Sequence, residues 1–216
     1  MLKIETFVVN MIQENCYIVS DETHETVIID CGAFYDNDKE RIKAYIEKNE
    51  LVPVHSIFTH GHFDHIIGSK FLFDTYGIKP EIPAKDTDLY YDCEKQLNDF
   101  VGLNINLQLP NINKIIDDKY KIKFGTHTLS VISTPGHTPG GVSFYCKEEN
   151  VLFSGDSLFY CSVGRTDLPG GDGNVLIEML KQNILTLPEE TTVFPGHGCA
   201  TSIGFEKENN PYITTL

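Results

Sequence analysis

The sequence has little positive charge, no tryptophan and no long apolar run. None of its apolar stretches approaches the ~20 residues of a membrane-spanning helix, and residues 1–20 lack the basic start, apolar core and cleavage site of a secretory leader. Lys and Arg number 17 against 31 Asp and Glu, and the resulting net charge of −14 repels nucleic-acid phosphates and anionic lipid. We therefore expect a cytoplasmic protein with no nucleic-acid or membrane partner; the sequence leaves its oligomeric state open.

Paired cysteines are also missing, because the six cysteines contain no C-x-x-C motif. A chain of 216 residues buries enough core to fold without disulfides, so we expect the cysteines to be reduced, buried and structural. With 41% apolar and 22% charged residues, the composition is that of a globular protein and excludes disorder. No linker of low complexity interrupts the chain. We expect one domain spanning residues 1–216.

Short runs of β-branched and aromatic residues alternate with helical patterns along the chain. They predict strands at 4–9, 15–19, 26–29, 54–58, 120–124, 128–133, 142–146, 151–153 and 191–194. Helices are expected at 36–49, 64–76 and 174–187, with a short one from about residue 201. Asp64 is the expected N-cap of the second helix, and Gly77 its stop. Two strand-rich halves that each end in helices favour an α/β (α+β) fold with two sheets inside and helices outside.

The segment T-H-G-H-F-D-H at residues 59–65 places three imidazoles and a carboxylate at a strand-to-helix turn. In extended chain His60 and His62 point the same way, whereas Asp64 and His65 at the helix start point elsewhere. This arrangement predicts two neighbouring metal ions, and imidazole with carboxylate suits Zn, Fe or Mn. A solvated turn that happens to contain histidines is the alternative, and the density of ligands argues against it.

Three further segments follow the same pattern at the ends of predicted strands, namely T-P-G-H at 134–137, S-G-D at 154–156 and P-G-H at 195–197. Each offers one ligand, which is His137, Asp156 or His197. Any one of them alone is typical of an ordinary turn, but their recurrence at strand ends favours a metal centre held by rigid elements. The remaining histidines are expected on the surface or in the core.

The order H-x-H-x-D-H, His, Asp, His resembles the metallo-β-lactamase superfamily, and within it the short glyoxalase II-like (hydroxyacylglutathione hydrolase-like) bacterial group. The resemblance implies a four-layer αββα sandwich, without the C-terminal helical domain that helps glyoxalase II hold glutathione. It also implies a ligand set: His60, His62 and His137 for one metal, Asp64, His65 and His197 for the other, and Asp156 as the bridge. Residues 154–165 (S-G-D-S-L-F-Y-C-S-V-G-R) are similar to the family's G-D-[ST]-L-F stretch, which ends in a basic residue.

The activity implied by this resemblance is hydrolysis of thioesters of the hydroxyacylglutathione type by a metal-bound hydroxide, with two divalent ions, first of all zinc, as cofactors. Asp64 is expected to orient the nucleophile and to accept its proton. Arg165 is expected to anchor an anionic end of the substrate, although an ion pair with a neighbouring Asp is the alternative. Phe159 and Tyr160 are expected to line the acyl pocket, although aromatic pairs near strand ends also serve as core.

Two other functions fit the same residues. Persulfide dioxygenases resemble the chain through the same motifs and through the G-R-T-D segment at 164–167, but they use one iron on two histidines and a carboxylate. A non-catalytic metal-binding module is the other alternative. The complete second ligand set favours the hydrolase, because seven ligands for two ions leave room for a water. The acidic run at 86–99 is expected to be a solvated helix face rather than a lid.

Overall fold

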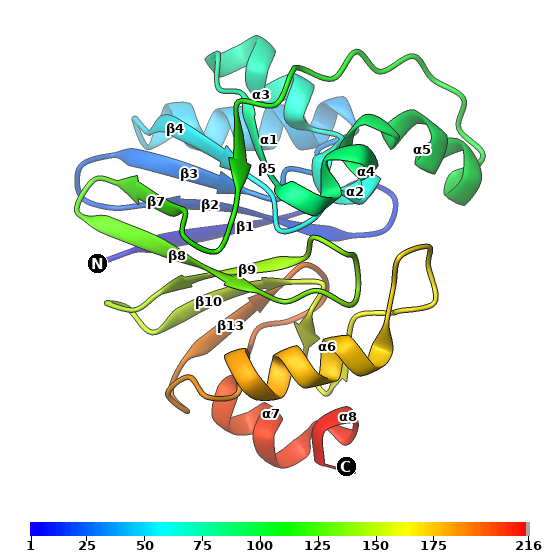
Figure 1. The fold of residues 1–216 in the computed structure, drawn as a ribbon. Coiled ribbons are helices and arrows are strands. Elements are labelled where there is room, and N and C mark those ends of the chain that lie inside the picture. Colours follow the sequence, from blue (N-terminus) through cyan, green and yellow to red (C-terminus); the bar gives the residue numbers. More distant parts are fainter. Residues whose placement is uncertain (215–216) are drawn as a thin grey trace.

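The computed structural model describes residues 1–214 and consists of four layers, helix–sheet–sheet–helix (Figure 1). The first sheet runs in the order β1 (Lys3–Val9), β2 (Glu14–Ser20), β3 (Glu25–Ile29), β4 (Val52–Ile57), β5 (Pro80–Pro83), β6 (Lys114–Ile116). The second runs β14 (Thr201–Ser202), β13 (Thr192–Pro195), β10 (Val151–Gly155), β9 (Val142–Cys146), β8 (His127–Ser133), β7 (Lys121–Phe124). The αββα expectation is confirmed.

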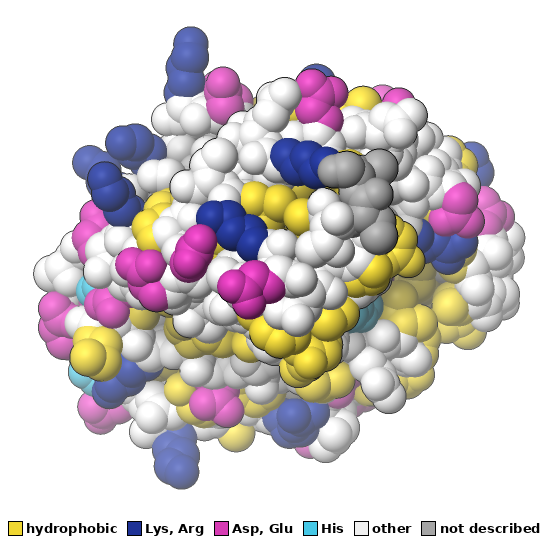
Figure 2. All heavy atoms as spheres, turned by 90° about the horizontal axis from the view of Figure 1, so that it is seen from below, with side chains coloured by type: hydrophobic (Ala, Val, Ile, Leu, Met, Phe, Trp, Pro, Cys, Tyr) yellow, Lys and Arg dark blue, Asp and Glu magenta, His cyan; other side chains and the backbone are white. Residues whose placement is uncertain are grey.

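Helices cover the outer face of each sheet (Figure 1). The first sheet carries α1 (Asp36–Lys48) and α3 (Ser69–Tyr76), and the second carries α6 (Gly173–Met179) and α7 (Ile203–Asn209). Three shorter helices, α2 (Phe63–Ile66), α4 (Thr87–Tyr91) and α5 (Cys93–Val101), lie beside the first sheet, and α8 (Pro211–Thr214) ends the described chain. On the face seen in Figure 2, Lys and Arg side chains are scattered among acidic and hydrophobic ones.

Three apolar layers hold these elements together, because successive residues of a strand face opposite sides of its sheet. In β2, Ile18 joins the cluster that contains residues of α1 and α3, whereas Val19 packs between the sheets. In β10, Phe153 packs between the sheets, and Leu152 joins the cluster under α6 and α7. Burial on both faces explains why these strands are apolar without alternation.

The predicted helix at 64–76 is wrong in one respect, because the structure divides it into α2 and α3. The break lies at Gly68, whose N–H donates to the carbonyl of Cys31 at 2.8 Å. A Cβ atom at this position would lie 2.5 Å from that carbonyl oxygen, so only glycine permits the approach. Asp64 is not an N-cap either, since His62 occupies that position. Gly77 ends α3 with a left-handed φ of 71°, as expected.

Other differences lie at the margins of the predicted pattern. The helix expected at 174–187 is α6 followed by a π-helical segment at Leu180–Ile184. Strands β5, β6 and β14 and the hairpin of β11 (Leu158–Phe159) and β12 (Ser162–Val163) were not predicted. The acidic run at 86–99 forms α4 and most of α5. Its carboxylates at Asp88, Asp92, Glu94 and Asp99 are exposed, as expected for a solvated face, but Asp86 at its start is fully buried.

All six cysteines are free, yet the expectation that all are buried is wrong for two of them. Cys161, in the β11–β12 turn, is partly exposed, and Cys199, in the loop after β13, is exposed. The other four lie in the apolar interior, where a thiol packs as a small hydrophobic group. Among residues 1–214, no helix has the length and apolar character needed to cross a membrane.

Candidate metal centre

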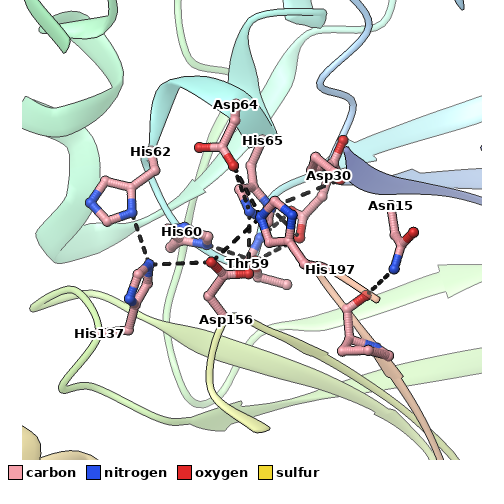
Figure 3. Close-up of polar contacts among 12 residues, drawn as sticks. Asn15, Asp30, Thr59, His60, His62, Asp64, His65, His137, Asp156 and His197 are labelled. Atoms are coloured by element: carbon pink, nitrogen blue, oxygen red, sulfur yellow. Dashed lines mark hydrogen bonds and ion pairs between the residues drawn. The ribbon is translucent and has the colours of Figure 1, made fainter. Parts of the chain in front are cut away.

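The predicted ligands meet at one edge of the sandwich, where several strands end (Figure 3). Asp156 directly follows β10, His197 lies two residues after β13, and His60 lies three residues after β4. His137 sits in the loop that leaves β8, and α2 supplies Asp64 and His65. The structure thus brings together all seven residues expected to bind metal.

The first group of ligand atoms belongs to His60, His62 and His137, which lie within 4.8 Å of one another and are buried. His62 Nδ1 faces His137 Nε2 at 2.9 Å. The ring of His60 lies edge-on to both, with centroid distances of 4.8 and 4.9 Å. Three imidazoles that converge from two loops would together hold one metal ion.

The second group belongs to Asp64, His65 and His197. Asp64 Oδ2 lies 3.2 Å from His197 Nε2 and 3.4 Å from His65 Nε2. Asp156 stands between the two groups, because its Oδ1 atom lies 3.3 Å from His65 Nε2 and its Oδ2 atom lies 3.5 Å from His137 Nε2. Asp156 is therefore placed to bridge two ions.

The residues present fit divalent metal ions. Among the described residues, the buried atoms His60 Nε2, His65 Nε2 and Asp156 Oδ1 have no hydrogen-bond partner. Leaving such atoms buried and unpaired costs about 1–3 kcal/mol each. Because they point to the same small volume and are imidazole nitrogens or carboxylate oxygens, cations of the Zn, Fe or Mn type satisfy them.

Outer contacts fix the orientation of the ligand rings. His137 Nδ1 lies 2.6 Å from the carbonyl oxygen of Arg165, and His197 Nδ1 lies 3.2 Å from that of Gln13. His65 Nδ1 lies 3.1 Å from Asp30 Oδ2. A ring that donates its Nδ1–H to an oxygen presents an unprotonated Nε2 to a metal, so the hydrogen bonds of His137 and His197 select the binding tautomer, whereas His65 Nδ1 makes an ion-pair contact without a hydrogen bond.

Burial and charge separate the two groups electrostatically. Burial, reinforced by His137, lowers the pKa of His62 to about 4. Burial also lowers the pKa of His60. For His65, burial opposes the charged ring, but the carboxylates of Asp64 and Asp156 outweigh it and raise the pKa. His60 and His62 are thus neutral and ready to bind, whereas a metal must displace a proton from His65.

Several residues that hold the site were missed by the sequence analysis. Asn15 Nδ2 donates to the carbonyls of Pro195 and Gly198, at 3.0 and 2.9 Å, and so fixes the loop around His197. Asp30 accepts from the N–H and hydroxyl of Thr59, at 2.7 and 2.6 Å. Asp30 did carry a signal, because it directly follows a buried strand as Asp156 does; Asn15 lies inside a strand and carried none.

A cavity of about 430 Å³ opens onto the ligands. Phe159 lines it, and its ring lies 6.3 Å from that of His197. Tyr160 does not line it: this ring is half exposed and stacks on Phe205 at 5.1 Å. Arg165 lines the cavity, but its guanidinium donates two hydrogen bonds to Asp167, at 2.8 and 2.7 Å. The role of Arg165 as an anion anchor stays a prediction.

Known proteins share this fold. A curated relative from Haemophilus influenzae, named hydroxyacylglutathione hydrolase GloC, is 32% identical and aligns over 99% of each chain. The solved BLEG-1 B3 metallo-beta-lactamase is 36% identical with a TM-score of 0.89, covering 99% of this chain and 100% of its own. TTHA1623 in a di-iron-bound form is 34% identical with a TM-score of 0.85, covering 96% and 99%. Since the family model of the metallo-beta-lactamase superfamily also matches residues 9–197, the chain belongs to that superfamily.

Proposed function

We propose that the protein is a two-metal hydrolase that cleaves acyl thioesters. One observation carries the proposal: five of the expected ligands, His62, Asp64, His137, Asp156 and His197, line the cavity. An acyl carbonyl that enters the cavity therefore reaches the metal centre directly. The relative named hydroxyacylglutathione hydrolase supports the thioester class, and zinc is the metal we propose first.

When bound, the two cations lower the pKa of a coordinated water toward neutrality and polarise the acyl carbonyl. Asp64 borders both the cavity and the second group of ligands, so we assign it to orient the attacking water and to accept its proton. Asp156 would hold both ions and offset their mutual repulsion.

The lining of the cavity favours a leaving group that needs no proton. Apart from the ligands, the described lining residues are Ile12, Phe63, Phe100, Val101, Phe159, Arg165 and Leu168. None of these is an acid that protonates a departing amine or alkoxide. A thiolate departs without such help, because thiols are far more acidic than amines or alcohols. The lining of the cavity therefore favours a thioester over a β-lactam amide.

The test is to remove metal with a chelator, reload the protein with zinc and measure thiol release from S-D-lactoylglutathione, with a chromogenic cephalosporin as the β-lactam control. We expect the reloaded protein to cleave the thioester, the metal-free protein to be inactive and the cephalosporin to be a poor substrate. Full activity without metal, or cleavage of the cephalosporin alone, contradicts the proposal. Asp64→Asn is expected to lower kcat in the loaded enzyme.

A persulfide dioxygenase activity is the second candidate. The G-R-T-D segment at 164–167 favours it. The di-iron-bound form of the similar protein TTHA1623 supports iron as a metal for this kind of site, but with two ions where a persulfide dioxygenase uses one. The iron-loaded protein should be given glutathione persulfide in an oxygen-electrode cell. Oxygen uptake without thioester cleavage assigns the oxidoreductase function and overturns the hydrolase.

A further inference from the structure

We propose that the acyl group of the substrate is an uncharged apolar chain, bound between Ile12 and Phe100 at the mouth of the cavity and Phe159 next to the ligands. This inference rests on the proposed thioester hydrolysis and adds the substrate class. It follows from three features of the cavity: exposed apolar side chains at its mouth, apolar residues behind them, and little positive charge among the side chains that line it away from the metal ligands.

The mouth of the cavity exposes two large apolar side chains that folding alone does not require. Ile12, in the β1–β2 turn, is 41% exposed, and Phe100, near the end of α5, is 46% exposed. The main-chain N–H of Ile12 donates to Asn10 Oδ1 at 3.0 Å, and the ring of Phe100 stacks on Phe63 with a centroid distance of 6.1 Å. Apolar side chains exposed around a cavity are typical of a surface that binds an apolar ligand.

The apolar wall continues from the mouth to the metal ligands. Phe63, which immediately follows the ligand His62, lines the cavity under Phe100. Phe159 meets the ring of His197 edge-on, at 72°. A chain attached to a carbonyl at the metal centre therefore has an apolar surface to follow from its first methylene groups to the solvent. The volume of about 430 Å³ is within the range of small-molecule sites.

The cavity offers an anionic substrate little attraction from its own side chains. Among the described residues that line it, Arg165 is the one cationic side chain, and Asp167 occupies its guanidinium through two hydrogen bonds. The adjoining hollow contains Lys95, but Asp92 and Asp99 line the same hollow and leave it net negative. These carboxylates do not repel an uncharged acyl chain, whereas they repel an acyl chain that carries a carboxylate.

The test compares kcat/KM of the zinc-loaded protein on acetyl, butanoyl, hexanoyl and octanoyl thioesters of N-acetylcysteamine, which are all uncharged. Each methylene group buried in the cavity is expected to raise kcat/KM by about fourfold, the equivalent of ~0.8 kcal/mol, until the cavity is filled. Phe100→Ala is expected to reduce the increase of kcat/KM with acyl chain length. The matched control is Phe73→Ala on α3, which removes a ring of similar exposure (37%) outside the cavity and should leave the series unchanged.

A binding measurement separates this inference from the proposed function. Uncharged S-alkyl thioethers of the same carrier, which cannot be hydrolysed, are titrated calorimetrically into the metal-free protein. Affinity that rises with chain length and falls in Phe100→Ala supports the apolar site even if no thioester is cleaved, in which case only the proposed hydrolysis fails. The inference is overturned if kcat/KM for S-D-lactoylglutathione exceeds that for every uncharged thioester and if kcat/KM for the uncharged thioesters does not depend on chain length. The proposed hydrolase function stands in that case.

Discussion

The carboxylate of Asp86 accepts a hydrogen bond of 2.6 Å from the hydroxyl of Thr138, in the loop that carries His137. The same Oδ2 atom accepts from the N–H of Gly61 at 3.0 Å, between His60 and His62. Its other oxygen accepts from the N–H of Gly140 at 2.6 Å. One buried carboxylate thus ties together the two loops that supply all three ligands of the first metal group.

Asp86→Asn is expected to lower the affinity for the metal ion of the first group by about 10- to 100-fold, which is the usual cost of losing an outer contact to a metal site. An amide NH₂ cannot accept the bonds that one carboxylate oxygen now accepts, so the loops lose their common anchor. The measurement is zinc affinity by competition with a chromophoric chelator. Asp88→Asn, an exposed position on α4 with the same change of charge, is the control. Unchanged affinity in Asp86→Asn, with the protein folded, contradicts this role.

Asp156→Ala is expected to loosen both metals, because Asp156 contacts ligands of both groups and offsets the repulsion between two cations. Elemental analysis after dialysis should give less than one metal per chain. Asp64→Ala is the comparison, since Asp64 belongs to the second group alone and should release one metal. If Asp156→Ala retains two metals per chain, the assignment of Asp156 as the bridging ligand is wrong.

The residues that meet at the candidate metal centre could be predicted from sequence because they lie in local patterns, a strand followed by a turn that contains glycine and a His or Asp. Asp86 could not, because its partner Thr138 is 52 residues away and its own surroundings are those of an exposed acidic helix. The division of the second helix was missed for the same reason: the constraint on Gly68 comes from the distant carbonyl of Cys31. Contacts between loops far apart in sequence therefore set the limit of the prediction.

His127 is expected to give a pH-dependent contribution to stability away from the metal centre. Its ring is buried between Asp21 and Glu149, with Nδ1 and Nε2 at 2.9 and 3.1 Å from their carboxylates. Burial opposes the charged ring, but these hydrogen bonds outweigh it and raise the pKa of His127. A raised pKa stabilises the fold fully below the ordinary His value of about 6.5, and the effect is lost as pH rises through the folded value.

The substitution His127→Gln should therefore destabilise the metal-free protein more at pH 6 than at pH 9, by about 1–3 kcal/mol at the lower pH. Urea unfolding at both pH values measures the difference. His24→Gln, at an exposed histidine, is the control and should change little at either pH. Equal destabilisation at pH 6 and pH 9 means that the charge on His127 contributes nothing.

Arg165 acts on the site through its main chain, and its side chain is engaged elsewhere. The carbonyl oxygen that holds His137 is retained in Arg165→Ala, so metal content should not change. The guanidinium is 58% exposed, and its ion pair lowers the pKa of Asp167 to about 2, so the pair is intact at neutral pH. Because Asp167 already neutralises this charge, we expect Arg165→Ala to change kcat/KM by less than about fivefold on both lactoylglutathione and an uncharged thioester.

Asp167→Asn separates the two roles that the sequence allowed for Arg165. Freeing the guanidinium should raise kcat/KM for the anionic thioester by up to about fivefold and leave the uncharged one unchanged, because exposed ion pairs are worth at most about 1 kcal/mol. If Arg165→Ala instead lowers kcat/KM on the anionic thioester alone by tenfold or more, the arginine anchors the substrate despite its partner. Hydrogen bonds to charged groups contribute about 1.5–3 kcal/mol, which is large enough for that result. The two variants together therefore decide whether the guanidinium of Arg165 pairs with Asp167 or with the substrate during turnover.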